Sequence, residues 1–403
     1  MNSQLFIEMR FLLGLASMLI MSMQKIKSWK ANSLIAIFII WITFGLPNSI
    51  YFFISVFLNI FLLWKFQPNE YFFTVLNIFI LYIYKFIGKY IDPRIGGTFD
   101  ISGILMIQTV KTSYIAKYFD NSMSNVLNYL LFTPGLVTGP IMPYDVFIKR
   151  DTSVKVKFPT KQLLITLGYV IVYSSLKTFP FLDYVLDSKN TFIAKIVYLY
   201  LYNICGRTKF HFAWNFAHCC FILRNFPEYL NIDFNSVEIP QSVAEISAGW
   251  NKFINIWIKT IFYLPIKPKS TILAIMTSVI VAAFLHGINL GYLIFVASFS
   301  IYRSPISRAN KFLRLKTLKQ IQMIFFIMYF SMPFYLLNVF SLLRLWRSVY
   351  FFGHIYFSFW FLVYWFEKLF MKPSTDVKAN ENKDENTKKV KNELDQNKTI
   401  KIE

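Results

Sequence analysis

Long apolar runs dominate the pattern of hydrophobic and polar positions along this sequence. A run of about 18 residues or more can cross a bilayer as a helix, allowing for tilt. The runs predict about ten or eleven membrane-spanning helices. The candidate spans are residues 4–23, 33–46, 49–65, 70–91, 122–142, 162–185, 190–223, 250–265, 271–302, 320–342 and 348–371.

Two segments depart from this simple pattern. Residues 103–120 are too polar to span a membrane, and their apolar positions are typical of an amphipathic helix that lies in the interface or caps a cavity. The run over 271–302 contains His286 followed by Gly287, where we expect the helix to break. The predicted fold class is therefore an all-α polytopic membrane protein.

Composition supports the membrane class. The 403 residues are 56% hydrophobic, 19% aromatic and only 16% charged, whereas soluble domains carry roughly 25% charged residues. Three cysteines cannot build a disulfide framework. His211 and His218 share a helical face, but their segment offers no carboxylate to complete a metal site. We therefore predict no metal and no cofactor.

Charge predicts the orientation and the domain organisation. The formal net charge is +21, and residues 373–403 contain seven Lys and seven Asp or Glu, so the excess lies in residues 1–372. It concentrates at residues 149–161 and 303–319, which the positive-inside rule places in the cytoplasm. We expect a membrane domain over 1–372 and a disordered, cytosolic tail over 373–403. The basic residues form no domain with its own core, so nucleic-acid binding is not expected. One basic loop could also attract an anionic ligand such as coenzyme A.

His286 is the first candidate for chemistry. It ends an apolar run, and no charged residue lies within sixteen positions on either side. An ionisable group at membrane depth is costly and indicates a functional site. A structural histidine in a helix bundle remains the alternative. Gly287 weakens that alternative because it permits close approach of the backbone beside the imidazole. A neutral imidazole can take a proton from a hydroxyl.

Asn251 is the second candidate. It follows Trp250 at the start of an apolar stretch. Its amide can donate to a carbonyl oxygen and accept from a hydroxyl. A helix cap is the alternative role for an asparagine at such a position.

The stretch from Val237 to Asn251, with Val-Glu-Ile-Pro-Gln-Ser followed by Glu245 and Trp250-Asn251, resembles the membrane-bound O-acyltransferase family. Leu285-His286-Gly287 follows at a suitable distance. Upstream, Arg207-Thr-Lys-Phe-His211-Phe and the Gly139-Pro140 turn are also similar to family segments. Within the family, the Val237–Asn251 stretch is most similar to the porcupine branch, which acylates serine in Wnt proteins.

The resemblance implies a bundle of helices around a central tunnel in the endoplasmic reticulum membrane. It implies acyl-CoA, with a palmitoleoyl chain, as the donor and a Wnt serine as the acceptor. His286 would be the general base, and Asn251 would support the thioester carbonyl. The residues expected to bind substrate are Trp250, Glu245, Arg207, His211 and Gly287.

Other functions stay open. Gly291-Tyr292 after His286 is similar to the His-Gly-x-x-x-Gly-Tyr pattern of lysophospholipid acyltransferases in the same family. Asp233 and Glu238, if they lie at a tunnel mouth, would instead favour a basic peptide. A transporter would also place a histidine in a bundle, although no repeated halves are evident. An inactive scaffold that binds acylated Wnt would have the same sequence pattern.

Overall fold

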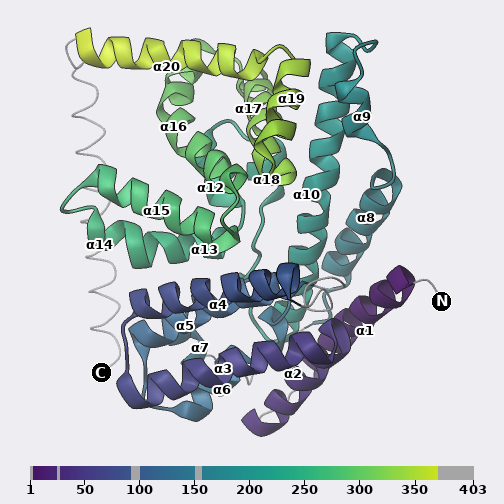
Figure 1. The fold of residues 1–403 in the computed structure, drawn as a ribbon, viewed down its shortest axis with the longest axis vertical. Helices are drawn as coiled ribbons and strands as arrows, with labels where there is room; N and C mark the ends of the chain where they lie inside the picture. Colours follow the sequence, from purple (N-terminus) through teal and green to yellow (C-terminus); the bar gives the residue numbers. More distant parts are fainter. Residues whose placement is uncertain (1–2, 25–27, 92–99, 150–156, 371–403) are drawn as a thin grey trace.

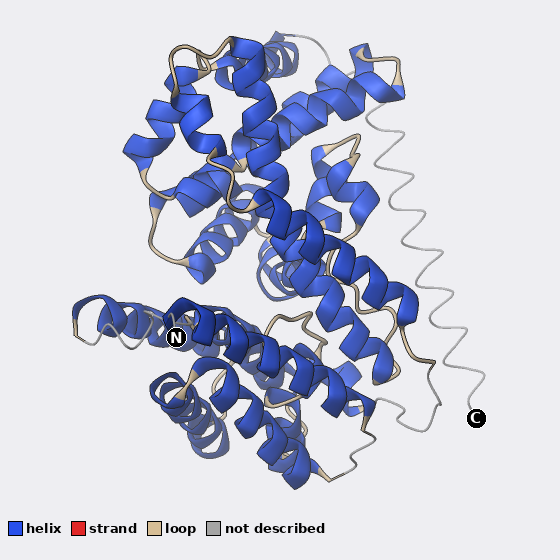
Figure 2. Ribbon diagram, turned by 90° about the vertical axis from the view of Figure 1, so that its right-hand side faces the viewer, coloured by secondary structure: helices blue, strands red, loops and turns tan. Residues whose placement is uncertain are grey.

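The computed structural model describes residues 3–24, 28–91, 100–149 and 157–370. All regular secondary structure in these ranges is helical, and loops join the helices (Figure 2). Several helices begin after a residue whose side chain accepts a hydrogen bond from a backbone N–H of the first turn, as Asn69, Thr191 and Ser270 do. Such caps satisfy donors that the helix itself cannot pair. The class predicted from the apolar runs is confirmed to the extent that the fold is all-helical.

The first part of the chain forms one group of helices, in which α5 packs against α3, α4, α6 and α7. Their bounds are α1 Ser3–Met23, α2 Trp29–Phe44, α3 Leu46–Phe66, α4 Glu70–Tyr90, α5 Ser102–Tyr118, α6 Met123–Leu130, the 3-10 turn η1 Thr133–Gly135, and α7 Tyr144–Ile148. Three helices follow and run along one side of the molecule in Figure 1: α8 Thr160–Leu176, α9 Phe181–Leu186 and α10 Phe192–Leu223.

The second group follows α10. It comprises α11 Phe234–Glu238, α12 Val243–Gly249, α13 Lys252–Ile258, the π-helical segment η2 Lys259–Tyr263, α14 Leu264–Ile266, α15 Thr271–His286, α16 Leu290–Phe312, α17 Lys316–Phe330, α18 Met332–Leu336, α19 Val339–Ser348 and α20 Phe352–Phe370. In Figure 1 this group lies above the first one, and α10 reaches from one group to the other.

Two main cores hold the described helices together. Leu105, Tyr114 and Tyr129 belong to the larger core, which joins the first helices to α13 and α15. Phe326, Tyr329 and Trp346 belong to a second core, which joins the helices from α16 to α20 to α9, α10 and α12. A small third cluster contains Trp214, Ile232 and Val237, with Phe210 and Trp250 packed against it. This third cluster matters for function because it adjoins the candidate site.

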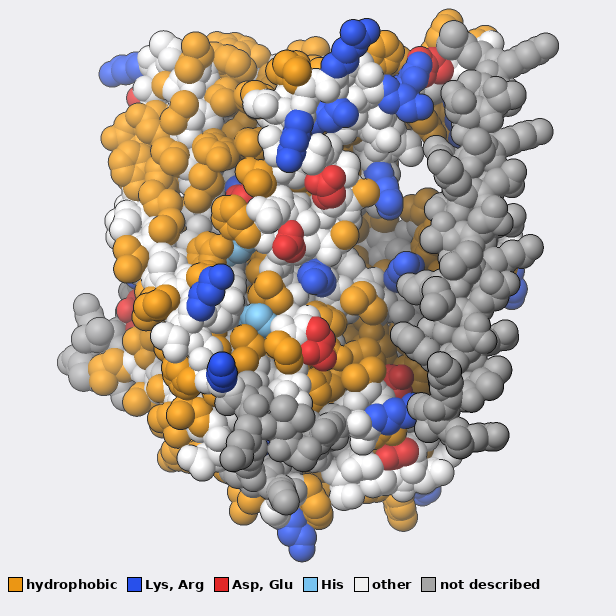
Figure 3. All heavy atoms as spheres, turned by 180° about the vertical axis from the view of Figure 1, so that it is seen from behind, with side chains coloured by type: hydrophobic (Ala, Val, Ile, Leu, Met, Phe, Trp, Pro, Cys, Tyr) orange, Lys and Arg blue, Asp and Glu red, His pale blue; other side chains and the backbone are white. Residues whose placement is uncertain are grey.

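Fewer helices than expected have the length and composition of a membrane span. Within the described ranges two do, α3 and α4, and a third if α19 and α20, which meet at 89°, are one broken span. Helices α2 and α15 are apolar but shorter. The predicted number of ten or eleven spans is therefore not matched by this criterion. Large hydrophobic side chains are nevertheless exposed along many helices, and they cover much of the face in Figure 3.

Several predicted boundaries are wrong. Residues 122–142 are not one span, because α6 ends at Leu130 and a 3-10 turn and an irregular segment with Pro134 and Pro140 follow. The basic segment 303–319 is not a loop, since α16 continues to Phe312 and α17 begins at Lys316.

The amphipathic helix predicted over 103–120 forms as α5, but it does not lie at an interface. Eleven of its seventeen residues are buried, among them Gln108, Lys111 and Tyr114. The polar positions of this segment suggested a side that faces water. In the structure these residues instead form hydrogen bonds with other helices inside the protein. Gln108 accepts a hydrogen bond from Ser55 at 2.9 Å, and the Lys111 ammonium donates to the carbonyl oxygen of Leu130 at 3.0 Å.

The predicted break near His286 is confirmed. Helix α15 ends at His286, and α16 begins at Leu290. The predicted tail, 373–403, lies outside the described residues.

Candidate active site

His286 is the last residue of α15, and its position depends on the glycine that follows. Gly287 has a φ of +139°, a conformation that side chains with a Cβ rarely adopt. Its N–H donates to the carbonyl oxygen of Ala283 at 3.2 Å, and the chain then turns into α16. The glycine therefore ends the helix directly after the histidine.

The imidazole of His286 lies among aromatic rings. Its centroid is 5.4 Å from the ring of Tyr292 and 5.4 Å from the ring of Phe334, which meets it edge-on. Among the residues that the structure describes, neither ring nitrogen of His286 has a hydrogen-bond partner. The basic nitrogen of a neutral imidazole is therefore available to a hydroxyl that enters this half-buried position.

Asn251 occupies a left-handed backbone conformation between α12 and α13, with a φ of +48°. Asparagine tolerates this conformation better than most residues. Its Oδ1 accepts a hydrogen bond from Nδ2 of Asn231 at 3.0 Å, and Oδ1 of Asn231 accepts from the N–H of Phe253 at 3.1 Å. The side chain of Asn231 thereby orients that of Asn251. Within the described ranges, the amide NH2 of Asn251 has no partner, so it can donate to a ligand.

A chain of ring contacts connects the neighbourhoods of these two residues. Trp250, which precedes Asn251, lies 5.3 Å from Phe210, Phe210 lies 6.0 Å from Phe334, and Phe334 lies 5.4 Å from His286, all between centroids. These rings come from α10, α18 and the end of α12. The structure thus joins through packing two positions that are 35 residues apart in the sequence.

Arg207 and His211 are engaged by one carboxylate. Glu238 accepts hydrogen bonds from Nε of Arg207 at 2.9 Å and from Nη2 of Arg207 at 2.6 Å, and it pairs with Nε2 of His211 at 2.9 Å. His211 also stacks on Tyr169, with centroids 4.7 Å apart. Arg207 and His211 are buried. This Arg207–Glu238–His211 cluster fastens α11 to α10, next to the segment that carries Asn251.

The remaining acidic residues of this segment accept hydrogen bonds from backbone N–H groups at the starts of α11 and α12. Glu245 accepts a hydrogen bond from the N–H of Gln241 at 2.8 Å, and Oδ1 of Asp233 accepts from the N–H of Ser236 at 2.8 Å. The hydrogen bonds from Ser236 hold the pKa of Asp233 below its usual range. The carboxylates of Asp233, Glu238 and Glu245 therefore all have partners within the chain.

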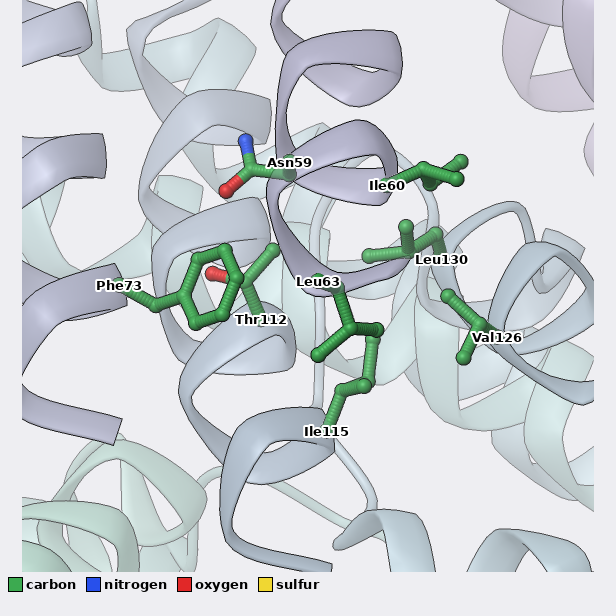
Figure 4. Close-up of a pocket in the computed structure, with 8 residues that line it drawn as sticks. All are labelled: Asn59, Ile60, Leu63, Phe73, Thr112, Ile115, Val126 and Leu130. Carbon is green, nitrogen blue, oxygen red and sulfur yellow. The ribbon is translucent and has the colours of Figure 1, made fainter. Parts of the chain in front are cut away.

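A pocket in the first group of helices lies apart from this site. It is formed between α3, α5 and α6, with Phe73 of α4 beside them (Figure 4). Its lining residues are Asn59, Ile60, Leu63, Phe73, Thr112, Ile115, Val126 and Leu130. Neither His286 nor Asn251 is among them. Over the described part of the chain, no group of three His, Cys, Asp or Glu side chains could hold a metal ion.

Comparison with known proteins identifies the family. The model of the membrane-bound O-acyltransferase family, MBOAT, matches residues 60–352, well over half of the chain. The chain belongs to this family. It is accordingly a multi-pass membrane protein, in agreement with its exposed apolar helices. The sequence resemblance to the family is thus confirmed, while its porcupine branch gains no support from this match.

The chain also has a relative in Saccharomyces cerevisiae. The chain is similar to a yeast protein named lysophospholipid acyltransferase, with 24% identity over 396 aligned residues. The alignment covers 74% of this chain and 62% of the yeast protein. The chain thus spans less than two thirds of the length of that relative.

Sequence reasoning missed several residues that shape the site. Asn231, Phe210 and Phe334 orient or adjoin the predicted residues, and Lys85 and Tyr82 of α4 donate hydrogen bonds to the end of α15. Lys85 could have been noticed, since it is a charge inside an otherwise apolar run. The others have no distinctive signal in a single sequence.

Proposed function

We propose that this MBOAT protein transfers a fatty acyl group from acyl-CoA to a hydroxyl of a lysophospholipid. The observation that carries the proposal is the environment of His286. Tyr292, the last residue of the His-Gly-x-x-x-Gly-Tyr pattern similar to lysophospholipid acyltransferases, packs its ring against the imidazole at 5.4 Å. The similarity to the yeast protein points to the same branch.

The acidic residues argue against the peptide acceptor. A basic peptide would be favoured by Asp233 and Glu238 only if their carboxylates were free. Asp233 caps α11, and Glu238 is paired with Arg207 and His211. This removes the physical argument for a basic peptide, although it does not bear on the Val237–Asn251 similarity itself.

In the proposed reaction His286 is the general base. Its neutral ring nitrogen takes the proton of the acceptor hydroxyl as the hydroxyl oxygen attacks the carbonyl carbon of the thioester. The amide NH2 of Asn251 donates a hydrogen bond to the carbonyl oxygen, on which negative charge develops. The carbon–sulfur bond then breaks, an ester forms, and the departing thiolate of coenzyme A takes the proton from the imidazolium.

Gly287 and the aromatic rings would position the reactants. The glycine lets the backbone approach the donor beside the imidazole, and Trp250, Phe210 and Phe334 provide an apolar wall against which an acyl chain can lie. No metal or prosthetic group enters the scheme.

The test is a competition between two acceptors. Purified protein in nanodiscs receives labelled acyl-CoA with equal concentrations of lysophosphatidylcholine and a serine peptide derived from a Wnt protein, and lipid and peptide products are separated. We expect label in the phospholipid. Label found only in the peptide would indicate a protein-serine acyltransferase instead. Binding of acyl-CoA without any transfer would indicate an inactive scaffold.

A further inference from the structure

Lys85 places a charge in a helix that otherwise has the composition of a membrane span. Helix α4 is one of the two described helices that are long and apolar enough to cross a bilayer. A charged side chain there is costly and needs a specific partner. The ammonium of Lys85 donates a hydrogen bond to the carbonyl oxygen of His286 at 2.8 Å. Within the described ranges, Lys85 has no ion pair with a carboxylate.

Tyr82 makes a similar contact three residues earlier on α4. Its hydroxyl donates to the carbonyl oxygen of Phe284 at 2.7 Å, and its ring lies 6.4 Å from the ring of Phe284. Residues three apart share one face of a helix. Side chains of one face of α4 therefore bind two carbonyl groups in the last turn of α15.

These contacts meet a need of the helix end. The last carbonyl groups of a helix have no partner within it, and they favour a positive charge nearby. Because α15 ends at His286, no later residue of this helix donates a hydrogen bond to the carbonyl oxygens of Phe284 and His286. The donors come instead from Tyr82 and Lys85, some 200 residues away in the chain, with sequence separations of 202 and 201.

We propose that Lys85, assisted by Tyr82, is a positioning residue that holds the last turn of α15 and thereby the imidazole of His286. The inference rests on the proposed function in that His286 is the base. Without the hydrogen bonds from Lys85 and Tyr82, the last turn of α15 frays, and the imidazole is no longer held against Tyr292 and Phe334. A displacement of about 1 Å can cost on the order of 100-fold in rate.

The experiment compares four proteins in the acyl-transfer assay: wild type, Lys85→Met, Lys85→Arg and Tyr82→Phe. We expect Lys85→Met to lower kcat by about 10- to 100-fold with little change in KM for acyl-CoA. Lys85→Arg keeps a cationic donor and should restore most of the activity. Tyr82→Phe removes one hydroxyl and should have a smaller effect in the same direction. The matched control is Lys89→Met, since Lys89 is exposed one turn later on α4 and lies over the ring of Tyr90.

A second readout does not depend on the acceptor. Diethyl pyrocarbonate modifies accessible histidines, and mass spectrometry of the digested protein locates the modified residue. His286 should react faster in Lys85→Met than in the wild type or in Lys89→Met. If Lys85→Met changed neither kcat nor the rate of modification of His286, the inference would be overturned. A rise in KM at constant kcat would also overturn it, because Lys85 would then be a contact to the substrate. A wild-type protein that acylates no lysophospholipid would instead refute the proposed function. The modification rates would still test whether Lys85 positions His286.

Discussion

The side chains of His286 and Asn251 differ in the hydrogen bonds that they can form with a ligand: the first can accept one, and the second can donate one. The imidazole has an acceptor nitrogen to offer, whereas Asn251 has already used its oxygen to accept from Asn231 and retains only its amide hydrogens. A base and a hydrogen-bond donor are the two groups that attack of a hydroxyl on a thioester requires. The sequence suggested both residues, and the family resemblance implied their roles. The contact with Asn231, which no motif identifies, leaves the NH2 group of Asn251 as the part that can bind a carbonyl oxygen.

Replacement of the base should separate chemistry from binding. His286→Gln should lower kcat by about 100- to 10,000-fold, because a glutamine cannot take up the proton. Binding of acyl-CoA, measured with a labelled analogue, should stay within about twofold, since binding contacts are distributed along the ligand. His354→Gln is the control, because the imidazole of His354 is half-buried and contacts Tyr329 of the second core instead of the candidate site. Turnover of His286→Gln at the wild-type rate would exclude His286 as the base.

The conformation of Asn251 determines which substitution tests it cleanly. Alanine would add strain at a φ of +48°, whereas glycine accepts this conformation. We therefore expect Asn251→Gly to keep the fold and to lower kcat by about 100-fold, the effect of losing one donor to a developing oxyanion. Asn251→Asp, which can still accept from Asn231 but has no NH2 group, should lose activity to a similar extent. If either variant weakened acyl-CoA binding tenfold at normal kcat, Asn251 would be a contact to bound substrate instead.

At the scale of elements, the apolar runs predicted most of the helices but not how they end. Helices α3, α4 and α10 follow runs in the sequence closely, and the break before α16 was expected from Gly287. The prediction over 122–142 failed because apolar content does not distinguish a spanning helix from a buried irregular segment. Helix α5 does not lie at an interface because its polar residues pair with α3 and α6, and such pairing is not visible in one sequence. The alternative, that this segment lies beside a cavity, agrees with Thr112 and Ile115 in the lining of the pocket.

The Arg207–Glu238–His211 cluster should stabilise the second group of helices. Glu238→Ala would leave the buried guanidinium of Arg207 without its partner and should lower the free energy of unfolding by about 3 to 5 kcal/mol. Thermal denaturation in detergent measures the loss. Glu228→Ala removes an exposed carboxylate from the preceding loop and should have little effect. A double variant, Arg207→Met with Glu238→Leu, should recover much of the stability. A stable Glu238→Ala protein would indicate that water reaches the cluster.

The close approach of α16 to α18 requires a residue without a side chain. A Cβ at Gly291 would lie 2.4 Å from the carbonyl oxygen of Pro333 and 2.9 Å from Cα of Leu337. Gly291→Ala should therefore lower the free energy of unfolding by about 1 to 3 kcal/mol. Gly168→Ala, in the middle of α8 with nothing within 4 Å, should stabilise the protein slightly. Equal melting temperatures for the two variants would contradict the close contact.

At the scale of the whole molecule, the sequence predicted the class and the family, whereas the arrangement of the spans stays open. The positive-inside rule predicts that residues 149–161 and 303–319 face the cytosol. We expect Lys157→Cys and Lys316→Cys to react with an impermeant maleimide only from the cytosolic side of sealed membrane vesicles that contain the protein. The native cysteines interfere little, since Cys219 and Cys220 are buried and Cys205 is partly buried. Labelling of either position from the lumen would reverse the orientation.

The pair formed by Trp214 and Trp250 has an optical consequence. The two indoles lie 5.1 Å apart at 76°, in a fixed and chiral arrangement. Neighbouring indoles in such an arrangement couple their electronic transitions, which should give a paired positive and negative band in circular dichroism. Because Trp250 adjoins Asn251, the amplitude of this signal should change when an acyl chain lies against the indole. The pair would thus serve as a native spectroscopic probe of the proposed site and report its occupancy without labelled substrate.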